Sequence, residues 1–337
     1  MRAVWITSTD GPAGLRVRET PDPEPGPGQV RVRAAGLCFA EVMGAQGLYP
    51  DRPKLPCVMG YEVAGVIDAV GDGAEAARVG SRVAALTRFG GHSDVVCVPG
   101  GQAFEIPDGK EFTEAAGLPV NYLTAYHMLF RVACVRPGER VLVHMAAGGV
   151  GTAVLQLCGT IADVVTFGTA SAAKHEALRA EGCTHPIDYR TTDYAAEVRR
   201  LTGGRGVDVV LDPLGGADWR KGLKLLRPAG RLVAYGFANL ASGQRRSRAH
   251  MLSQVAGIPL LTPLQLMNSN RTVSGVNIGR LWSEMDMLGP ELQDVLALWE
   301  EGRVTPRIDA TYPFAEAAEA HRRILSRQNT GKIVLTP

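Results

Sequence analysis

A glycine-rich turn between an apolar strand and a helix constrains this chain more than any other stretch of its sequence. Residues 141–151 read Val-Leu-Val-His-Met-Ala-Ala-Gly-Gly-Val-Gly, and a helix is predicted to begin near Val150. The spacing is that of G-x-G-x-x-G, with Ala146 at the first glycine position. Gly148 would let the backbone approach a pyrophosphate, Gly151 would allow close packing of helix on strand, and free helix N–H groups would face the phosphate charge. The dinucleotide contacts predicted in this turn are Gly148, Gly149, Val150 and Gly151.

Strand-like and helix-like segments alternate from Leu118 onward, which is typical of βαβ units and a parallel sheet. The first 110 residues instead show short runs broken by glycine and proline, such as 62–70, with little helical periodicity. We also expect a strand at 231–235, and near the end helices at 292–301 and 314–326 and a strand at 332–335. The pattern predicts an α/β protein in which a doubly wound nucleotide-binding domain is inserted into a β-rich domain. The predicted boundaries are 1–119 with 280–337 for the β-rich domain and 120–279 for the nucleotide-binding domain.

Composition excludes several classes of protein. With 337 residues, 45% of them hydrophobic and 21% charged, the chain is long and apolar enough to fold around two cores. A formal charge of +2, without a basic block that interleaves aromatic residues, argues against nucleic acid as a partner. No apolar run approaches the about 20 residues that span a bilayer, and no signal peptide is evident, so we expect no transmembrane segment and a cytoplasmic location. The six cysteines form no Cys-x-x-Cys pair, and most of them are expected to be reduced.

The strand after the glycine turn favours one nicotinamide cofactor over the other. An NAD site usually ends this strand with a carboxylate for the ribose 2′-hydroxyl, whereas residues 166–174 read Thr-Phe-Gly-Thr-Ala-Ser-Ala-Ala-Lys. Thr169 and Ser171 can donate hydrogen bonds and Lys174 supplies a positive charge, so a 2′-phosphate and hence NADPH are favoured. Alternatively, Ser171 only caps the next helix and Lys174 is solvated, and both interpretations can hold together.

Several of these residues also resemble a known family. The spacing of Gly138-Glu139, Leu142, the 146–151 turn and Gln156 is that of the quinone oxidoreductase and zeta-crystallin signature, with Gly159 in place of its final basic residue. The chain resembles most the branch of the vesicle amine transport protein homologues, which belongs to the zinc-free medium-chain dehydrogenases/reductases. The stretches that carry this likeness are 120–126, 144–151, 167–171, 185–189 and 212–216.

This resemblance implies a GroES-like catalytic domain joined to a Rossmann domain, with the active site in the cleft between them. Lys174 and Tyr189 would hold the 2′-phosphate, with Thr169, Ser171 and Arg327 nearby. Thr124 would lie near the nicotinamide, Gly236 near the ribose and Asn277 near the carboxamide end of the cofactor. Residues 271–279 would include an edge strand that pairs across a two-fold axis, so the resemblance implies a homodimer.

Zinc-dependent relatives raise the question of a metal. A catalytic zinc ion needs three protein ligands, and the matching positions here are Cys38, Tyr61 and Val120, of which only Cys38 is a usual ligand. Cys97 stands alone where a four-cysteine lobe would be. We therefore expect no metal site. Cys38 also replaces the asparagine that is usual in the zinc-free branch.

Without a metal, the substrate must be an electrophilic small molecule that carries its own activation, such as a quinone or an α,β-unsaturated carbonyl. Hydrogen-bond donors would then stabilise the anion that forms, and Tyr49 is the main candidate, with Asn121 as a second donor. Tyr49 can also be a packed ring at the cleft edge, and Asn121 a buried amide that ties down backbone. The sequence leaves open an enoyl-thioester reductase, and an NADPH-binding protein with structural, lipid-handling or regulatory work and little turnover.

The segment 237–270 is long for a connection in a Rossmann domain, and its 255–267 part is apolar and interrupted by prolines. Such an insertion predicts a lid, a dimer contact or a ligand surface. It lacks the basic polar face of a helix that lies on a membrane.

Overall fold

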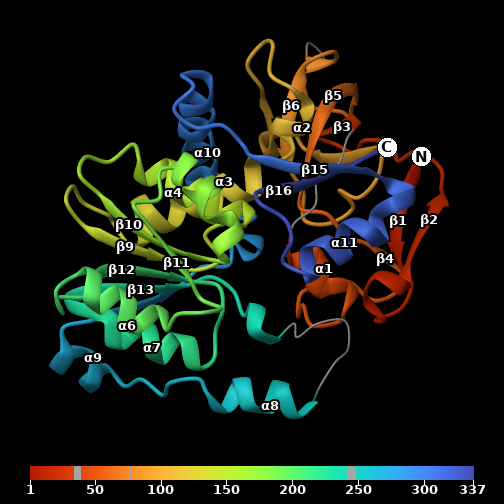
Figure 1. Ribbon diagram of the computed structural model, residues 1–337. Coiled ribbons are helices and arrows are strands. Elements are labelled where there is room, and N and C mark those ends of the chain that lie inside the picture. Colours follow the sequence, from red (N-terminus) through yellow and green to blue (C-terminus); the bar gives the residue numbers. More distant parts are fainter. Residues whose placement is uncertain (34–38, 76–77, 241–247) are drawn as a thin grey trace. The chain divides into compact units, whose positions relative to one another are not determined.

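The computed structural model describes residues 1–33, 39–75, 78–240 and 248–337. Its contacts divide the chain into two compact units (Figure 1). Unit 1 comprises Met1–Leu123 and Ile278–Pro337, and unit 2 comprises Thr124–Asn277. Cys38, the expected first metal-ligand position, lies outside the described residues.

Unit 2 is built on a six-stranded sheet in which every pair of neighbouring strands is parallel. In spatial order the strands are β11 (His185–Asp188), β10 (Val165–Ala170), β9 (Arg140–Val143), β12 (Val207–Asp212), β13 (Leu226–Ala234) and β14 (Thr272–Gly275). Numbered along the chain, this order is 3-2-1-4-5-6, the arrangement of a doubly wound dinucleotide-binding domain. The predicted fold class is confirmed for this unit.

Helices cover both faces of this sheet, which explains why its central strands are apolar throughout. Val141, Leu142 and Val143 of β9 are all fully buried. Figure 1 shows α6 and α7 on one face and α4 on the other. The helices of unit 2 are α4 (Gly149–Cys158), α5 (His175–Ala180), α6 (Tyr194–Leu201), α7 (Ala217–Leu225), α8 (Arg248–Ala256) and α9 (Pro263–Ser269), while α3 (Pro119–Tyr126) crosses the boundary between the units.

Unit 1 is β-rich, as expected for the first part of the chain, and neighbouring strands of its five-stranded sheet are antiparallel. Its five-stranded sheet is β7 (Val96–Pro99), β3 (Gln29–Arg33), β5 (Glu62–Val70), β6 (Arg82–Leu86) and β8 (Ala103–Glu105). A second sheet has β2 (Leu15–Glu19), β1 (Arg2–Ile6) and β4 (Cys57–Val58), and β15 (Ile308–Pro313) pairs with β16 (Lys332–Thr336). Its helices are α1 (Phe39–Ala45), α2 (Phe112–Ala115), α10 (Met285–Glu300) and α11 (Ala317–Leu325).

Two elements begin earlier than the sequence suggests. The helix expected at 292–301 starts at Met285 and contains Pro290, a residue that usually marks a helix start because it lacks an N–H donor. The strand expected from residue 231 starts at Leu226, and its pairing with β12 shifts register before Arg231. The intervening Pro-Ala-Gly looks like a break in the sequence because such residues are rare inside regular strands.

Candidate nucleotide site and acceptor region

The glycine turn follows β9 at the point where the strand order reverses, since β10 lies on one side of β9 and β12 on the other. Ligands of doubly wound sheets bind at this edge. Gly148 is the N-cap of α4, which begins at Gly149. A Cβ atom at Gly151 would lie 2.5 Å from the Met145 carbonyl oxygen and 2.6 Å from that of Ala146. The helix therefore packs on the turn more closely than any side chain at position 151 would allow.

The N-terminal end of α4 offers N–H groups rather than a side-chain cap. The first N–H groups of a helix have no partner inside it, and Gly148 has no side chain that could accept from them. A Cβ at Gly148 would approach the Met145 carbonyl oxygen to 3.3 Å, so this position is also narrow. The turn is thus a backbone cradle, open to an anion and suited to the pyrophosphate of a dinucleotide.

The turn after β10 carries Ser171 and Lys174, which are half-buried, whereas the Thr169 side chain is buried. Ser171 stands at the N-cap of the 3₁₀ turn Ala172–Lys174 and makes no side-chain capping bond, contrary to the simple capping interpretation. The Lys174 backbone N–H donates to the Ser171 carbonyl oxygen at 2.9 Å. Thr169 is 3% exposed, and its Oγ1 lies 3.1 Å from Nδ1 of His144. Its hydroxyl belongs to the interior and not to the exposed edge.

Other predicted cofactor residues also follow the carboxyl ends of parallel strands. Tyr189 is 38% exposed directly after β11, whose last residue pairs with Ala170 at the end of β10. Gly236 follows β13 closely, and its Cβ would lie 3.0 Å from the Pro213 carbonyl oxygen. Asn277 is exposed shortly after β14. Because all these strands run in parallel, the sheet brings these residues to one edge.

Sequence reasoning missed two buried polar residues at the same edge, His144 and Asp212. Asp212 ends β12, and its Oδ1 accepts the N–H groups of Leu214 at 2.6 Å and Gly215 at 3.1 Å. Both residues are fully buried. In each case the sequence signal that could have indicated the residue is a polar side chain directly after an apolar run.

In unit 1, Tyr49 belongs to an aromatic cluster that we define as Tyr49, Tyr61, Phe89 and Trp282. The Tyr49 and Tyr61 rings meet edge to face, with centroids 6.1 Å apart. Burial and a hydrogen bond with Tyr49 raise the pKa of the Tyr61 phenol. Tyr61, which stands at the second metal-ligand position, is thus a buried packing residue, while Tyr49 is half-buried.

A buried ion pair lies beside the start of α3. Lys332 Nζ pairs with Glu62 Oε1, and both side chains are almost fully buried. The other oxygen of Glu62 accepts the N–H of Val120 at 2.7 Å. Helix α3 carries Asn121 and Thr124, which are 6% and 8% exposed. Glu62 and Lys332 therefore fix the helix on which two predicted site residues stand.

The last predicted cofactor residue, Arg327, lies in unit 1. It is exposed and follows α11. Within the described ranges, no three His, Cys, Asp or Glu side chains gather as a metal site. No helix in the described part of the chain combines the length and apolarity needed to cross a membrane.

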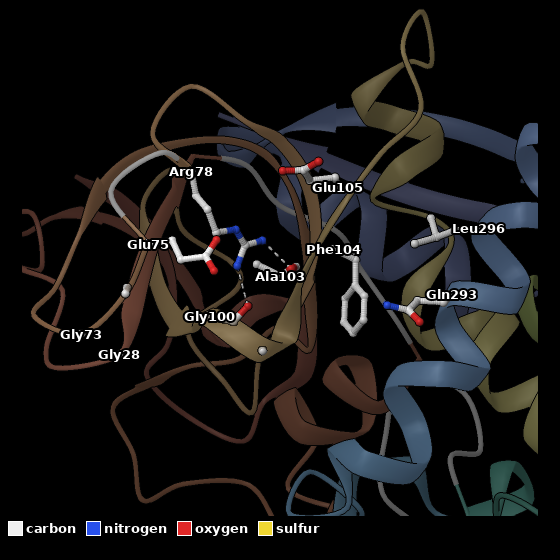
Figure 2. A pocket seen from close by; sticks show the side chains of 12 residues that line it. Gly28, Gly73, Glu75, Arg78, Gly100, Ala103, Phe104, Glu105, Gln293 and Leu296 are labelled. Carbon is white, nitrogen blue, oxygen red and sulfur yellow. Dashed lines mark hydrogen bonds between the residues drawn. The ribbon is translucent and has the colours of Figure 1, made fainter.

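A cavity of about 710 Å³ lies in unit 1 between the five-stranded sheet and α10. Figure 2 shows the Arg78 guanidinium turned toward the Gly100 and Ala103 carbonyl oxygens, to which it donates at 2.8 and 2.6 Å. Phe104 and Gln293 line the cavity farther along. None of the predicted cofactor or substrate residues is among its lining residues.

The 237–270 segment contains helices α8 and α9, and large apolar side chains of these helices and of the residues between them are exposed. Leu260 is 91% and Leu252 is 71% exposed. The others are Val255, Leu261, Leu264 and Met267.

Comparisons with known proteins agree with this architecture. Residues 24–108 match the family model of the alcohol dehydrogenase GroES-like domain, and residues 181–335 match that of the zinc-binding dehydrogenases. The synaptic vesicle membrane protein VAT-1 homolog of Rattus norvegicus is 48% identical over 308 residues, which cover 91% of this chain and 76% of the relative.

Two solved structures share the fold over nearly the whole chain. The Escherichia coli quinone oxidoreductase complexed with NADPH is 26% identical, with a TM-score of 0.88 and full coverage of both chains. The CurK enoyl reductase is 28% identical, with a TM-score of 0.84, and the match covers 99% of this chain and 98% of that one.

Proposed function

Since the chain belongs to the VAT-1 homologue branch of the quinone oxidoreductase-like medium-chain dehydrogenases/reductases, we propose that it is an NADPH-dependent reductase of electrophilic carbonyl compounds. Its substrate class would be quinones or α,β-unsaturated carbonyls, reduced without a metal ion. The glycine turn carries this proposal, because it forms a backbone cradle at the point where the order of a parallel sheet reverses.

Residues at the carboxyl edge of the unit 2 sheet would hold the cofactor. The α4 N–H groups would face the pyrophosphate, and Lys174, Ser171 and Tyr189 the 2′-phosphate. The solved Escherichia coli relative contains NADPH, which supports this choice. The proposed cofactor contacts are Thr124, Gly148, Gly149, Val150, Gly151, Ser171, Lys174, Tyr189, Gly236, Asn277 and Arg327.

The acceptor would be activated by hydrogen bonds and not by a Lewis acid. NADPH supplies the hydride when it is bound. The Tyr49 hydroxyl would donate to the oxygen on which negative charge develops, and the Asn121 amide would be a second donor. Because the hydrogen bond between Tyr49 and Tyr61 ties the two phenols together, Tyr61 would orient the Tyr49 hydroxyl.

The proposal is tested by following the absorbance of NADPH, and of NADH in parallel, with quinones, enones and enoyl thioesters, with and without a chelator. We expect NADPH-selective turnover of quinones or enones that a chelator leaves unchanged. Turnover that requires a metal, or no oxidation of NADPH by any acceptor, would contradict it.

Two alternatives are outcomes of the same assay. The likeness to the CurK enoyl reductase favours an enoyl-thioester reductase, which would oxidise NADPH fastest with the thioesters. The exposed apolar side chains of α8 and α9, together with the name of the VAT-1 relatives, favour an NADPH-binding protein with little turnover. That protein would bind NADPH tightly and oxidise it with none of the acceptors.

We further propose a cytoplasmic homodimer. Strand β14 lies at the edge of the unit 2 sheet and pairs, among the described strands, with β13 alone. A second copy of β14 could continue the sheet across a two-fold axis. Sedimentation of the purified chain should give the mass of a dimer, and a proline substitution at Val273 should give a monomer.

A further inference from the structure

The three central strands of the unit 2 sheet end in one row of polar side chains. In the sheet register, Gly168 of β10 lies beside Val143 of β9, which lies beside Leu211 of β12. The next residues along these strands are Thr169, His144 and Asp212. They occupy one face, on which the preceding row is apolar and belongs to a core cluster. That apolar row is Phe167, Leu142 and Val210.

His144 stands in the middle of this polar row with two different neighbours for its ring nitrogens. Nδ1 lies 3.1 Å from the Thr169 hydroxyl, whereas Nε2 has no hydrogen-bond partner among the described residues. Asp212 Oδ2 likewise lacks a hydrogen bond within the described ranges. The two side chains are fully buried at the ends of neighbouring strands, where polar atoms are costly to leave unpaired.

The protonation of His144 follows from its burial. Burial lowers the pKa of the imidazole, although the nearby Asp212 carboxylate acts in the opposite sense. The ring is therefore neutral near pH 7, with one N–H and one acceptor nitrogen. If Nδ1 accepts from the Thr169 hydroxyl, Nε2 carries the hydrogen, and the nearby Asp212 carboxylate interacts favourably with that N–H through its charge.

This row joins two backbone segments of the nucleotide site. His144 immediately precedes the glycine turn, and its own N–H donates to the Leu211 carbonyl oxygen at 3.2 Å. Asp212 holds the following turn through its bonds to the Leu214 and Gly215 N–H groups. Pro213 of this turn packs against Gly236.

We propose that Thr169, His144 and Asp212 form a buried polar row that positions the glycine turn and the turn after β12 for the dinucleotide. They are positioning residues, because none of them reaches the exposed edge. The inference rests on the proposed function, since it assumes that NADPH binds at this edge. The row would affect binding of the pyrophosphate and nicotinamide half of the cofactor. Binding of the 2′-phosphate end would depend on the separate turn after β10.

The test compares two ligands that share the adenosine end. NADPH spans the whole edge, whereas adenosine 2′,5′-bisphosphate reaches only the adenosine part. In His144→Phe and Asp212→Asn, we expect the Kd for NADPH to rise about tenfold and the Kd for the bisphosphate to stay within about twofold. His321→Phe is the matched control, because His321 is another buried histidine without a hydrogen-bond partner among the described residues, and it lies in unit 1.

Each outcome has a distinct meaning. An equal loss of affinity for both ligands, or no loss of affinity for either, would overturn the positioning role. A similar effect of His321→Phe on the two Kd values would show that the substitutions act only through the stability of the protein. Failure of the unmodified chain to bind NADPH would contradict the proposed function instead. If the variants do not fold, nitrogen NMR of the unmodified protein still decides, because hydrogen on Nδ1 of His144 would contradict the row and hydrogen on Nε2 would support it.

Discussion

The two units build their candidate sites in different ways. In unit 2 the site is mostly backbone, and its main part is a contiguous run from His144 to Gly151 at the end of one strand. In unit 1 the groups around the proposed acceptor residues come from distant parts of the chain, as the Glu62–Lys332 pair shows with its members 270 positions apart. A site made of turns is therefore encoded by neighbouring residues in the sequence, whereas a site made of buried side chains is not.

The largest loss of stability is expected at the buried ion pair of unit 1. Lys332→Met should lower the free energy of unfolding by about 3–5 kcal/mol, because it leaves the Glu62 carboxylate buried without its counter-charge. Urea denaturation measures the change. The matched control is Lys224→Met, which removes an exposed lysine of α7 and should change stability by no more than about 0.5 kcal/mol. Equal effects of the two substitutions would refute the role given to the pair.

A double variant distinguishes an effect of charge from an effect of packing. Adding Glu62→Gln to Lys332→Met removes the unpaired charge, so most of the lost stability should return. If the double variant is instead as unstable as the sum of two single losses, the pair acts through packing and not through charge.

A smaller effect is expected from His321 in the interior of unit 1. Burial lowers the pKa of His321 to about 4 from an ordinary value near 6.5. Since the unfolded chain takes up the proton first, stability is lost as the pH falls from about 6.5 to about 4, by up to about 3 kcal/mol. Urea denaturation at several pH values should show this slope, and His321→Phe should remove its share. An unchanged slope in the variant would assign the acid sensitivity to other groups.

In unit 2 the glycine turn leaves no room for a side chain at position 151. Gly151→Ala places a Cβ where the Met145 carbonyl oxygen would be only 2.5 Å away, so the turn must shift. A shift of this kind costs about 1–3 kcal/mol, and we expect the Kd for NADPH to rise about 10- to 100-fold. Gly101→Ala is the control, because nothing lies within 4 Å of its added Cβ. NADPH affinity that survives Gly151→Ala would contradict the cradle.

The smallest expected effect concerns the 2′-phosphate. Lys174→Gln removes one charge-assisted contact, worth about 1.5 kcal/mol, so the Kd for NADPH should rise about tenfold while that for NADH stays the same. Fluorescence titration with both cofactors measures this. Lys224→Gln, a substitution of the same chemistry on exposed α7, should change neither affinity. A parallel loss of NADH affinity would place Lys174 elsewhere than at the 2′-phosphate.

Much of unit 2 was predictable because its physics is local. The apolar run at 141–143 and the glycines after it predict strand, turn and helix together, and the structure starts α4 within one residue of the expected position. The Thr169 hydroxyl is buried and not exposed as expected, because the sequence does not say which side chains at the end of a strand are covered by neighbouring residues. Its place beside His144 depends on register with β9, which is a tertiary property.

Less of the unit 1 site could be predicted. The sequence singled out Tyr49 and Asn121, but nothing local links Tyr49 to Tyr61 or Trp282, or Lys332 to Glu62. These contacts arise when antiparallel strands and returning C-terminal segments pack together, and no short-range pattern encodes them. The early starts of α10 and β13 have a simpler cause, since proline and glycine there resemble element boundaries.

We propose above all that this chain uses NADPH as a reductant, bound at the carboxyl edge of the unit 2 sheet. The most direct measurement is kcat/KM for NADPH and for NADH with the best acceptor of the panel, in the presence of a chelator. We expect turnover, with a kcat/KM for NADPH at least about tenfold above that for NADH. Equal values for the two cofactors, or NADPH that binds but is not oxidised, would contradict it.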